Sequence, residues 1–539
     1  MQESRSQNYI QGAAILAAAS IFVKIIGAVY KIPILKILDD GGRGSFQVTY
    51  NVYTFLLVLS TAGVPAALSR LISSAAASGK AGLAKRFFSV SLPAFVIIGT
   101  VAMLMMFLFA DALAGLMGDS LAAPGIRVLA PAVFFACIIS IFRGYAQGYE
   151  NMIPTAVSQV IEVLSKAAFG IVAALLLTGM GYAMHIVSAG AIMGVTIGLG
   201  LCVPLLVWYK RKLDRTLPAA DESEELPGKI HVLGRLFKVS IPITLSASMM
   251  AIMTFIDTAV VMGRLQTGAL MLTEAGARSE FGKYALSISI YTLPLALIVP
   301  LSISIIPAIA AALARKQATE AGLIMKSSVK LVNLLAMPAA AGLMVLASPI
   351  MIALYNDSRE LPAKILLILG AASLFTCLQY ITTAILQANG HERIALMTFP
   401  VGAVVKIALS YILVANADIG ILGSPVGTLA CFAIIVFLNI VFIKIKVREK
   451  LGFITSTLKP LACTLVMAAV VYFVYAGVSR LGSAVISAGQ MAVIVYLGIA
   501  VLIGVSVYAV MIVVTRTITK EDLAYLPKGD KLAKLLRVR

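Results

Sequence analysis

Long apolar runs recur along the 539-residue chain. Runs such as 96–110, 161–178 and 492–514 approach or reach the roughly 20 residues that an α-helix needs to cross a ~30 Å hydrocarbon core. Hydrophobic residues make up 60% of the chain and charged residues 12%, whereas globular domains have roughly 25% charged residues. The sequence therefore predicts an all-α polytopic membrane protein and excludes soluble folds.

We expect about fourteen transmembrane helices, because the hydropathy pattern divides the chain into that many apolar segments. The expected spans are 9–38, 46–75, 87–110, 124–147, 154–179, 184–209, 236–263, 283–313, 327–355, 363–388, 394–415, 420–443, 456–478 and 488–515.

The net charge of +19 indicates topology in a protein of this class. Cytoplasmic loops of membrane proteins collect Lys and Arg, so the surplus does not imply a nucleic-acid partner. With the N-terminus in the cytoplasm, inner segments hold 30 basic residues and outer loops hold 8. We therefore expect a multi-pass protein of the plasma membrane with both termini in the cytoplasm.

The five cysteines lie far apart within apolar runs, and the three histidines are isolated. This spacing favours buried free thiols over disulfides and lacks the clustering of a metal site. We expect neither a metal nor a cofactor.

The longest polar insert, 210–229, follows six predicted spans and divides the chain into two halves. A faint repeat supports the division, because Gln147 to Lys166 and Gln387 to Lys406 share a 19-residue separation at an offset of 240. Six spans per half imply parallel repeats related by a pseudo-twofold axis along the membrane normal. The predicted organisation is an N-lobe (1–209), a cytoplasmic linker (210–235), a C-lobe (236–446), two appended C-terminal helices (447–515) and a basic cytoplasmic tail (516–539).

Two spans of the first half carry polar faces. In the first span, Ser20, Lys24, Gly27 and Lys31 recur at helical spacing with no acid in that span, so both lysines point the same way. Their charges must be met by another helix, by water or by an anionic ligand.

The fifth span carries a polar stripe at spacings of three and four. Glu162 and Lys166 stand four residues apart, which allows an internal ion pair. Alternatively, the stripe lines a hydrated cavity to which Lys166 adds positive charge. The stripe consists of Thr155, Ser158, Gln159, Glu162, Ser165 and Lys166.

The second half is less basic, with Asp257 in the predicted seventh span and Lys406 in the eleventh. The two side chains either pair with each other, or Asp257 binds a proton or a metal cation as a coupling site.

Several lysines at mid-membrane depth suit an anion, and lysine is a common point-charge binder of phosphate. Diphosphate is a good candidate, and the apolar surroundings suit a lipid-linked diphosphate whose tail stays in the bilayer.

Five segments resemble a known family, in order along the chain. They are GGRGSFQVTYNVYTFLLVLSTAGVPAALSRLIS at 41–73, FRGYAQGYENMIPTAVSQVIE at 142–162, YTLPLALIVPLSISIIPAIA at 291–310, LQANGHERIALMTFPVGAVVKIALSYIL at 386–413 and EDLAYLPKG at 521–529. Together they are similar to the MurJ/SpoVB-type lipid II flippases of Gram-positive bacteria, in the polysaccharide-transporter branch of the MOP exporter superfamily.

The resemblance implies two six-helix lobes around a central cavity that works by alternating access. The implied cargo is lipid II, an undecaprenyl-diphosphate-linked peptidoglycan precursor, moved from the inner to the outer leaflet of the bacterial plasma membrane. The family's basic first-span position falls on Lys24, and its Ser-Arg motif falls on Ser69 and Arg70, so the resemblance implies that these three residues contact the head group. Arg143 and Lys166 match further basic positions. Membrane lipids and cell-wall synthesis enzymes are the expected partners.

The chain departs from the family pattern in two places. Ile288 and Ser289 precede the YTLP motif where Gram-negative-type members carry an arginine. Some relatives bind sodium in the second lobe. Asp257 suits such a site, whereas the Lys406 ammonium would oppose it.

Three alternatives stay open. The chain could export another lipid-linked oligosaccharide for capsule or spore cortex. It could be a drug/cation antiporter of the same superfamily, although that predicts an acid-lined first lobe. It could be a membrane glycosyltransferase that uses Asp39 and Asp40 as its catalytic or metal-binding pair, although the predicted outer loops are short and 41–44 is typical of a turn.

Overall fold

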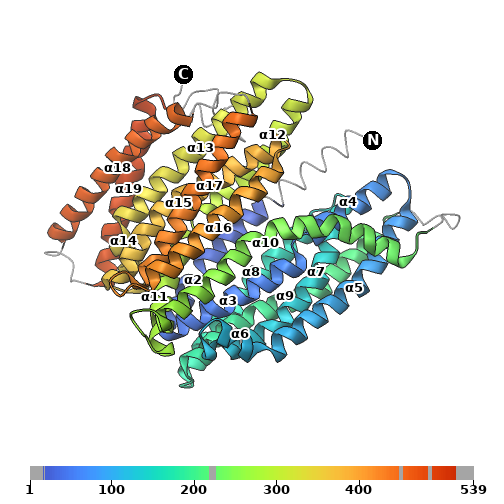
Figure 1. The fold of residues 1–539 in the computed structure, drawn as a ribbon, viewed down its shortest axis with the longest axis horizontal. Helices are drawn as coiled ribbons and strands as arrows, with labels where there is room; N and C mark the ends of the chain where they lie inside the picture. The colour runs from blue at the N-terminus through green and yellow to red at the C-terminus, as the bar shows by residue number, and fades with distance from the viewer. Residues whose placement is uncertain (1–15, 17, 218–225, 448–452, 483–488, 518–539) are drawn as a thin grey trace. The chain divides into compact units, whose positions relative to one another are not determined.

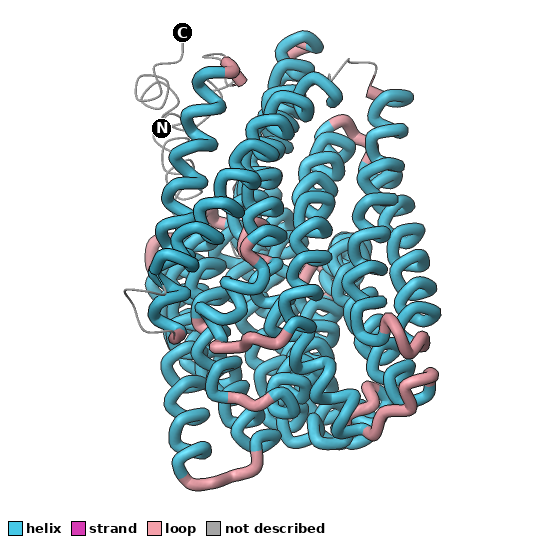
Figure 2. The backbone as a smooth tube through the Cα atoms, turned by 90° about the vertical axis from the view of Figure 1, so that its left-hand side faces the viewer, coloured by secondary structure: helices cyan, strands magenta, loops and turns pink. Residues whose placement is uncertain are grey.

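The computed structural model describes residues 16, 18–217, 226–447, 453–482 and 489–517, and every regular element in that part of the chain is helical (Figures 1 and 2). It contains 14 helical segments long and apolar enough to cross a membrane, which confirms the predicted all-α polytopic fold. The five cysteines are buried and free, as expected. Most of the predicted basic tail lies outside the described residues.

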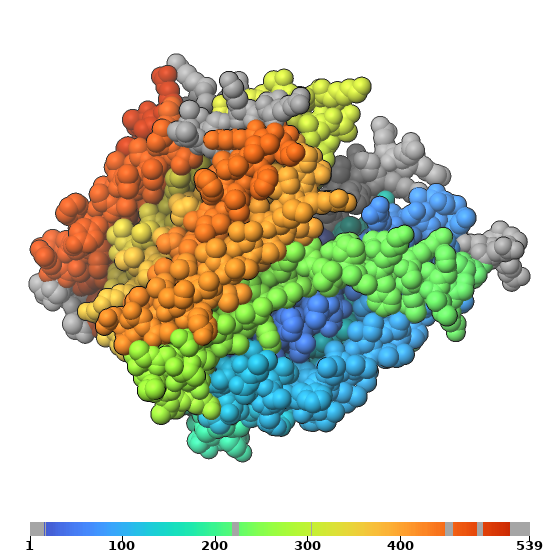
Figure 3. Space-filling view, viewed as in Figure 1, coloured from blue at the N-terminus to red at the C-terminus, as the bar shows by residue number. Residues whose placement is uncertain are grey.

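The chain forms two compact units, Met1–Ala285 and Leu286–Arg539. This division falls beyond the predicted linker, so the predicted lobe boundary stays a prediction. Helix α10 (Lys229–Thr267) packs on helices of the first unit and lies across one face of it (Figure 3).

The first unit begins with the span Ala18–Ile37, whose last part is α2 (Lys31–Ile37). Its remaining elements are α3 (Asp40–Thr61), α4 (Val64–Ala77), α5 (Ala81–Leu108), α6 (Ala110–Leu116), the short η1 (Ser120–Ala122), α7 (Ala123–Gly148), α8 (Ile153–Gly179), α9 (Met184–Asp214), α10 and the first part of α11 (Glu274–Tyr291).

Two expectations about the connections of this unit were wrong. Residues 41–44 are the first turn of α3 and not a loop, because the Asp39 carboxylate accepts a hydrogen bond from the Gly42 amide at 2.6 Å and caps the helix. The predicted linker is also shorter, since α9 continues to Asp214 and α10 begins at Lys229.

Helices α8 and α9 pack closely through glycines. A Cβ atom added to Gly194 would lie 2.6 Å from the carbonyl oxygen of Lys166, and one added to Gly198 would lie 2.9 Å from that of Glu162. Because these two glycines have no side chain, α9 can approach the backbone of α8 at the turns that carry the charged residues of α8.

A buried ion pair joins α3, η1 and α11 in the first unit. The Asp119 carboxylate, which is fully buried, accepts hydrogen bonds from Arg278 Nε at 2.6 Å and Ser45 Oγ at 2.8 Å. Arg278 also donates to Glu274 at 2.6 Å. A buried charge without a partner is strongly destabilising. The bonds of Asp119 to both Arg278 and Ser45 therefore hold the first part of α11 against α3.

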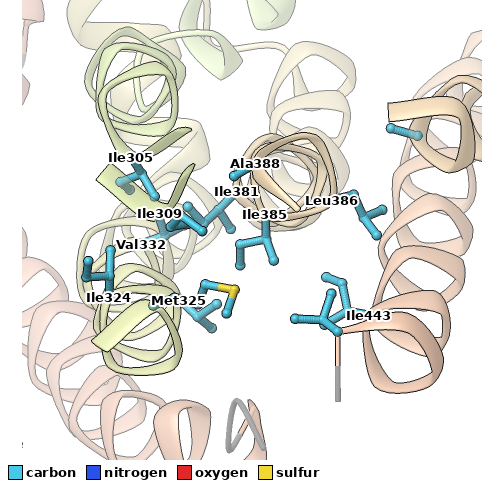
Figure 4. Close-up of a cluster of buried hydrophobic side chains, with 14 of the residues drawn as sticks. Ile305, Ile309, Ile324, Met325, Val332, Ile381, Ile385, Leu386, Ala388 and Ile443 are labelled. Atoms are coloured by element: carbon cyan, nitrogen blue, oxygen red, sulfur yellow. The ribbon is translucent and has the colours of Figure 1, made fainter. Parts of the chain in front are cut away.

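The second unit holds the end of α11 and the helices that follow. They are α12 (Leu295–Ala314), α13 (Ala318–Val345), α14 (Ala347–Tyr355), α15 (Glu360–Ala388), α16 (Glu392–Val414), η2 (Gly420–Leu422), α17 (Gly423–Lys446), α18 (Phe453–Gly482) and α19 (Gln490–Val514). An apolar core that includes Ile309, Met325 and Ile385 joins α12, α13 and α15 (Figure 4).

Two predicted spans of the second half are each divided. The expected span 283–313 is interrupted between α11 and α12. The break contains Pro294, which has no backbone N–H to donate to a helical hydrogen bond. The expected span 327–355 comprises α13 and α14. Hydropathy alone does not detect such breaks, since both sides are equally apolar.

The predicted repeat has a counterpart in the packing of each unit. In the first unit Gly194 of α9 lies against the Lys166 carbonyl oxygen. In the second unit an added Cβ atom on Gly427 of α17 would lie 3.0 Å from the Lys406 carbonyl oxygen. Each lysine-bearing helix therefore meets a glycine of the helix that follows it.

We predict that Gly194→Ala destabilises the protein by about 1–3 kcal/mol, because the new methyl group overpacks the contact between α8 and α9. Gly498→Ala in α19 is the matched control, since open space surrounds that position and alanine favours a helix. Thermal unfolding of the purified protein in detergent measures both. Equal melting temperatures for the two variants would contradict the proposed close contact.

Candidate functional site

The polar face of the first span packs along α8. Ser20 Oγ lies 3.5 Å from Gln159 Oε1, and an added Cβ atom on Gly27 would lie 3.8 Å from Val163. Ser20 and Gly27 lie two helical turns apart on the face of the first span that the spacing predicted. The structure therefore brings the polar faces of the first and fifth predicted spans together.

Two lysines of these faces converge on one tyrosine. Lys166 Nζ donates a hydrogen bond to the Tyr50 hydroxyl at 3.0 Å, and Lys31 Nζ lies 5.1 Å from the centre of the Tyr50 ring. Lys166 Nζ also lies 4.5 Å from the centre of the Tyr30 ring. Both distances fall within the ~6 Å range of cation–π attraction. We call Lys31, Lys166, Tyr30 and Tyr50 the lysine–tyrosine cluster.

Lys24 is a further lysine on the polar face of the first span. It lies on the same helical face as Ser20 and Gly27, between their two contacts with α8, and its side chain is only partly exposed. Within the described residues, no hydrogen bond or ion pair satisfies its ammonium group. A ligand-binding role for Lys24 stays a prediction.

The acid of the stripe pairs with a residue of α7. Glu162 Oε2 accepts a hydrogen bond from Arg143 Nη2 at 3.0 Å, and Arg143 Nε donates to Ser158 Oγ at 2.9 Å. The internal pair of Glu162 with Lys166, one of the two alternatives, is therefore not the pair that forms. Arg143 itself belongs to α7 and not to the turn that follows it.

The stripe thus divides between two neighbours of α8. Ser158 and Glu162 bond to α7, and Thr155 does so through Gln147 Nε2 at 3.1 Å. Gln159 and Lys166 contact the first span and α3. Whether this second edge borders a hydrated cavity stays a prediction.

Tyr30 and Tyr50 were missed in the sequence. Tyrosine is frequent in membrane helices, where its polar tip and apolar ring suit the interface, so its presence carries little signal. The available clue was the position of Tyr30 beside Lys31 in the first span.

Ser69 and Arg70, expected from the resemblance to contact the head group, lie in α4. Arg70 is exposed, and in the described part of the chain no hydrogen bond or ion pair joins it to the lysine–tyrosine cluster. Ser69 lies where α4 meets the end of α7, because its carbonyl oxygen would be 3.2 Å from a Cβ atom on Gly148. A role for either residue stays a prediction.

Asp257 and Lys406 are both buried, at 5% and 6% exposure. Asp257 lies in α10 of the first unit and Lys406 in α16 of the second. Each has a partner in the structure. Their pairing and a coupling role stay predictions.

Asp39 and Asp40, the pair that the glycosyltransferase alternative would use, both bond to the first turn of α3. Asp39 caps α3, and Asp40 forms an ion pair with Arg43 at 2.7 Å. Where Gram-negative-type members carry an arginine, Ser289 is buried and its hydroxyl lies 2.6 Å from that of Tyr355.

This fold is similar to those of solved membrane transporters. Among solved structures, an inward closed lipid II flippase MurJ matches 93% of this chain and 98% of its own at a TM-score of 0.71 and 16% identity. An inward-facing multidrug resistance MATE transporter of the MOP superfamily matches 80% of this chain and 98% of its own at 0.65 and 15% identity.

The chain belongs to the polysaccharide biosynthesis protein family, whose model matches residues 9–313. Three relatives from Bacillus subtilis (strain 168) are similar. The uncharacterized membrane protein YabM is 27% identical, covering 98% of this chain and 97% of its own. The lipid II flippase MurJ is 26% identical, covering 79% of this chain and 81% of its own. The stage V sporulation protein B is 24% identical, covering 97% of this chain and 98% of its own.

We predict that the separate effects of Arg143→Ala and Glu162→Ala on the free energy of unfolding add up to more than the effect of the double substitution. Each single change leaves one charge of a largely buried pair without its partner, with side-chain exposures of 16% and 32%. The coupling should be about 0.5–3 kcal/mol, the range for residues in contact. Thermal unfolding of the four proteins measures it, and strictly additive effects would contradict the pair.

Proposed function

We propose that this protein is a flippase that moves an undecaprenyl-diphosphate-linked cell-wall precursor, lipid II, from the inner to the outer leaflet by alternating access. The observation that carries the proposal is the convergence of Lys31 and Lys166 on Tyr50 inside the first unit. Within the described residues, neither these lysines nor Lys24 has an acidic partner.

A diphosphate is the ligand that this arrangement suits best. Lysine ammonium groups bind phosphate oxygens as point charges, and each ammonium has three N–H donors. Lys166 uses one of its three donors in the hydrogen bond to Tyr50. The tyrosine rings hold the lysines without neutralising them. An anion that enters would therefore meet uncompensated positive charge.

The membrane potential supports export of such a cargo. With the cell interior negative, moving two negative charges outward gains about 4–5 kcal/mol per 100 mV. The same potential draws the positively charged lysines of the unloaded carrier back towards the cell interior. We propose that the potential suffices as the energy source and that both termini lie in the cytoplasm.

The name of the relative MurJ makes lipid II the first cargo to test. A second candidate is another lipid-linked oligosaccharide, for capsule or spore cortex, because the relative named stage V sporulation protein B matches 97% of this chain. Both cargoes carry the same diphosphate. The cationic cluster argues against the antiport of cationic drugs, although the MATE transporters share the fold.

We predict that Lys24→Ala and Lys166→Gln each lower the transport rate by about tenfold or more, since hydrogen bonds to charged groups contribute about 1.5–3 kcal/mol. The measurement uses a bacterium depleted of its own lipid II flippase and follows labelling of lipid II from outside the cell. Lys36→Ala is the matched control, because Lys36 lies in the same span but is exposed.

Two results would refute parts of this proposal. Failure of the unaltered protein to restore outward movement of lipid II would exclude that cargo, and the assay would then be repeated with a spore-cortex or capsule precursor. Full activity of both lysine variants at normal expression would remove Lys24 and the lysine–tyrosine cluster from the mechanism.

A further inference from the structure

Helix α9 is longer than the membrane core that it crosses. It has 31 residues and is therefore about 46 Å long at the rise of an α-helix, whereas the hydrocarbon core is ~30 Å thick. The first Lys, Arg, Asp or Glu of this helix is Lys210, and the helix ends at Asp214. The last turns of α9 therefore lie among the lipid head groups.

One exposed side of α9 changes in character towards this end. Spacings of three and four residues place its members on the same side of the helix. In chain order they are Leu201, Pro204, Trp208, Arg211, Lys212 and Arg215, and all of them are exposed. We call these six residues the α9 face. It runs from apolar side chains, through the single tryptophan of the chain, to three cations.

Trp208 stands between the apolar and the cationic part of the α9 face. It is 55% exposed, and Lys212 Nζ lies 5.5 Å from the centre of its ring, within the ~6 Å range of cation–π attraction. An indole N–H can only donate, and among the described residues it has no acceptor here. A ligand on this face therefore meets one hydrogen-bond donor between its apolar and its anionic end.

The acid at this end of α9 is occupied by other residues of the first unit. Asp214 accepts a hydrogen bond from the Tyr145 hydroxyl at 2.7 Å and forms an ion pair with Lys210. Lys210 Nζ in turn lies 4.9 Å from the centre of the Phe88 ring of α5. In the described part of the chain, no ion pair joins the three cations of the α9 face to an acid. Their positive charge is therefore available to a ligand.

The order of groups along the α9 face selects the chemistry of its ligand. An apolar part, a donor and a group of cations are complementary to an acyl chain, an ester carbonyl and a phosphate in the same order. A soluble phosphate or an acidic peptide would leave the apolar part unused. A polyprenyl diphosphate has no ester carbonyl between its tail and its phosphates. The three cations would repel the ammonium group of a zwitterionic phospholipid.

We propose that the α9 face is a binding site for an anionic glycerophospholipid such as phosphatidylglycerol. The acyl chains lie along Leu201 and Pro204, and an ester carbonyl accepts a hydrogen bond from Trp208 Nε1. The phosphate contacts Arg211 and Lys212. The site uses no residue of the lysine–tyrosine cluster, so it is independent of the proposed cargo.

The fluorescence of Trp208 reports on this face alone, because the chain has no other tryptophan. The purified full-length protein is placed in phosphatidylcholine vesicles that contain brominated phosphatidylglycerol or brominated phosphatidylcholine in both leaflets. Bromine on the acyl chains quenches a tryptophan that it contacts. We expect a preference for phosphatidylglycerol of about fivefold or more, the effect of one lysine or arginine near the membrane surface. High salt should lower the preference.

Two matched variants separate the α9 face from the general positive charge of the protein. Changing Arg211, Lys212 and Arg215 to Gln should make the quenching of Trp208 by the two lipids equal, since the tryptophan and the apolar part stay in place. The control changes Lys80, Arg235 and Lys238 to Gln. It removes the same charge from exposed positions of the first unit outside the α9 face, and the preference should remain.

A third variant tests a rival occupant within the chain itself. Four acids follow α9 in the sequence, and the variant changes each to its amide: Asp221, Glu222, Glu224 and Glu225. The unaltered protein should already prefer phosphatidylglycerol, and this variant should prefer it to a similar degree.

Four outcomes would overturn the proposal. Equal quenching by both lipids in the unaltered protein would mean that the α9 face selects no head group. An equal loss of preference in the control would mean that diffuse surface charge attracts the lipid. A preference found only in the variant without the four acids would mean that this acidic segment occupies the face. Loss of the preference on addition of inorganic diphosphate, at constant ionic strength, would mean that the site takes a soluble anion.

Discussion

The position of the Lys166 ammonium group within a membrane-spanning helix constrains much of the first unit. A charge at that place is costly unless other groups replace its hydration. The Tyr50 hydroxyl at 3.0 Å and the Tyr30 ring at 4.5 Å do so without neutralising the charge. Because Tyr30 belongs to the first span and Tyr50 to α3, this requirement brings three separate segments together. The close approach of α9 through Gly194 further confines the backbone of α8 there.

The sequence predicted the helices and their polar faces well, because both follow from local periodicity. The spacing of Ser20, Gly27 and Lys31 placed these residues on one face, and that face contacts α8 in the structure. Hydropathy counted the spans for the same reason. It overlooked the interruption before Pro294, since a break between two apolar segments leaves mean hydropathy unchanged.

Partner choice was the part that local patterns could not predict. Glu162 has a basic residue four positions away in Lys166, yet it pairs with Arg143 nineteen positions away on another helix. The i,i+4 spacing allows an ion pair worth only a few tenths of a kcal/mol, so tertiary packing decides between the candidates. Tyr50 was missed for a related reason: its role depends on two lysines that only the folded chain brings to it.

The two units use corresponding positions for different chemistry. At the repeat offset of 240 residues, Arg143 and Ser158 correspond to Thr383 and Thr398. In the second unit these threonines hydrogen-bond to Asn439, at 3.2 and 2.8 Å, so a neutral network replaces the ion pair.

The position of Glu162 corresponds to Gly402, where an added Cβ atom would lie 2.5 Å from the Ile435 side chain and 3.0 Å from the Cys431 carbonyl oxygen. That spacing leaves no room for a carboxylate. The packing of α16 on α17 therefore excludes the charged arrangement from the second unit, whereas α8 retains it. Under the proposed function, an anionic cargo would therefore bind to lysines of the first unit.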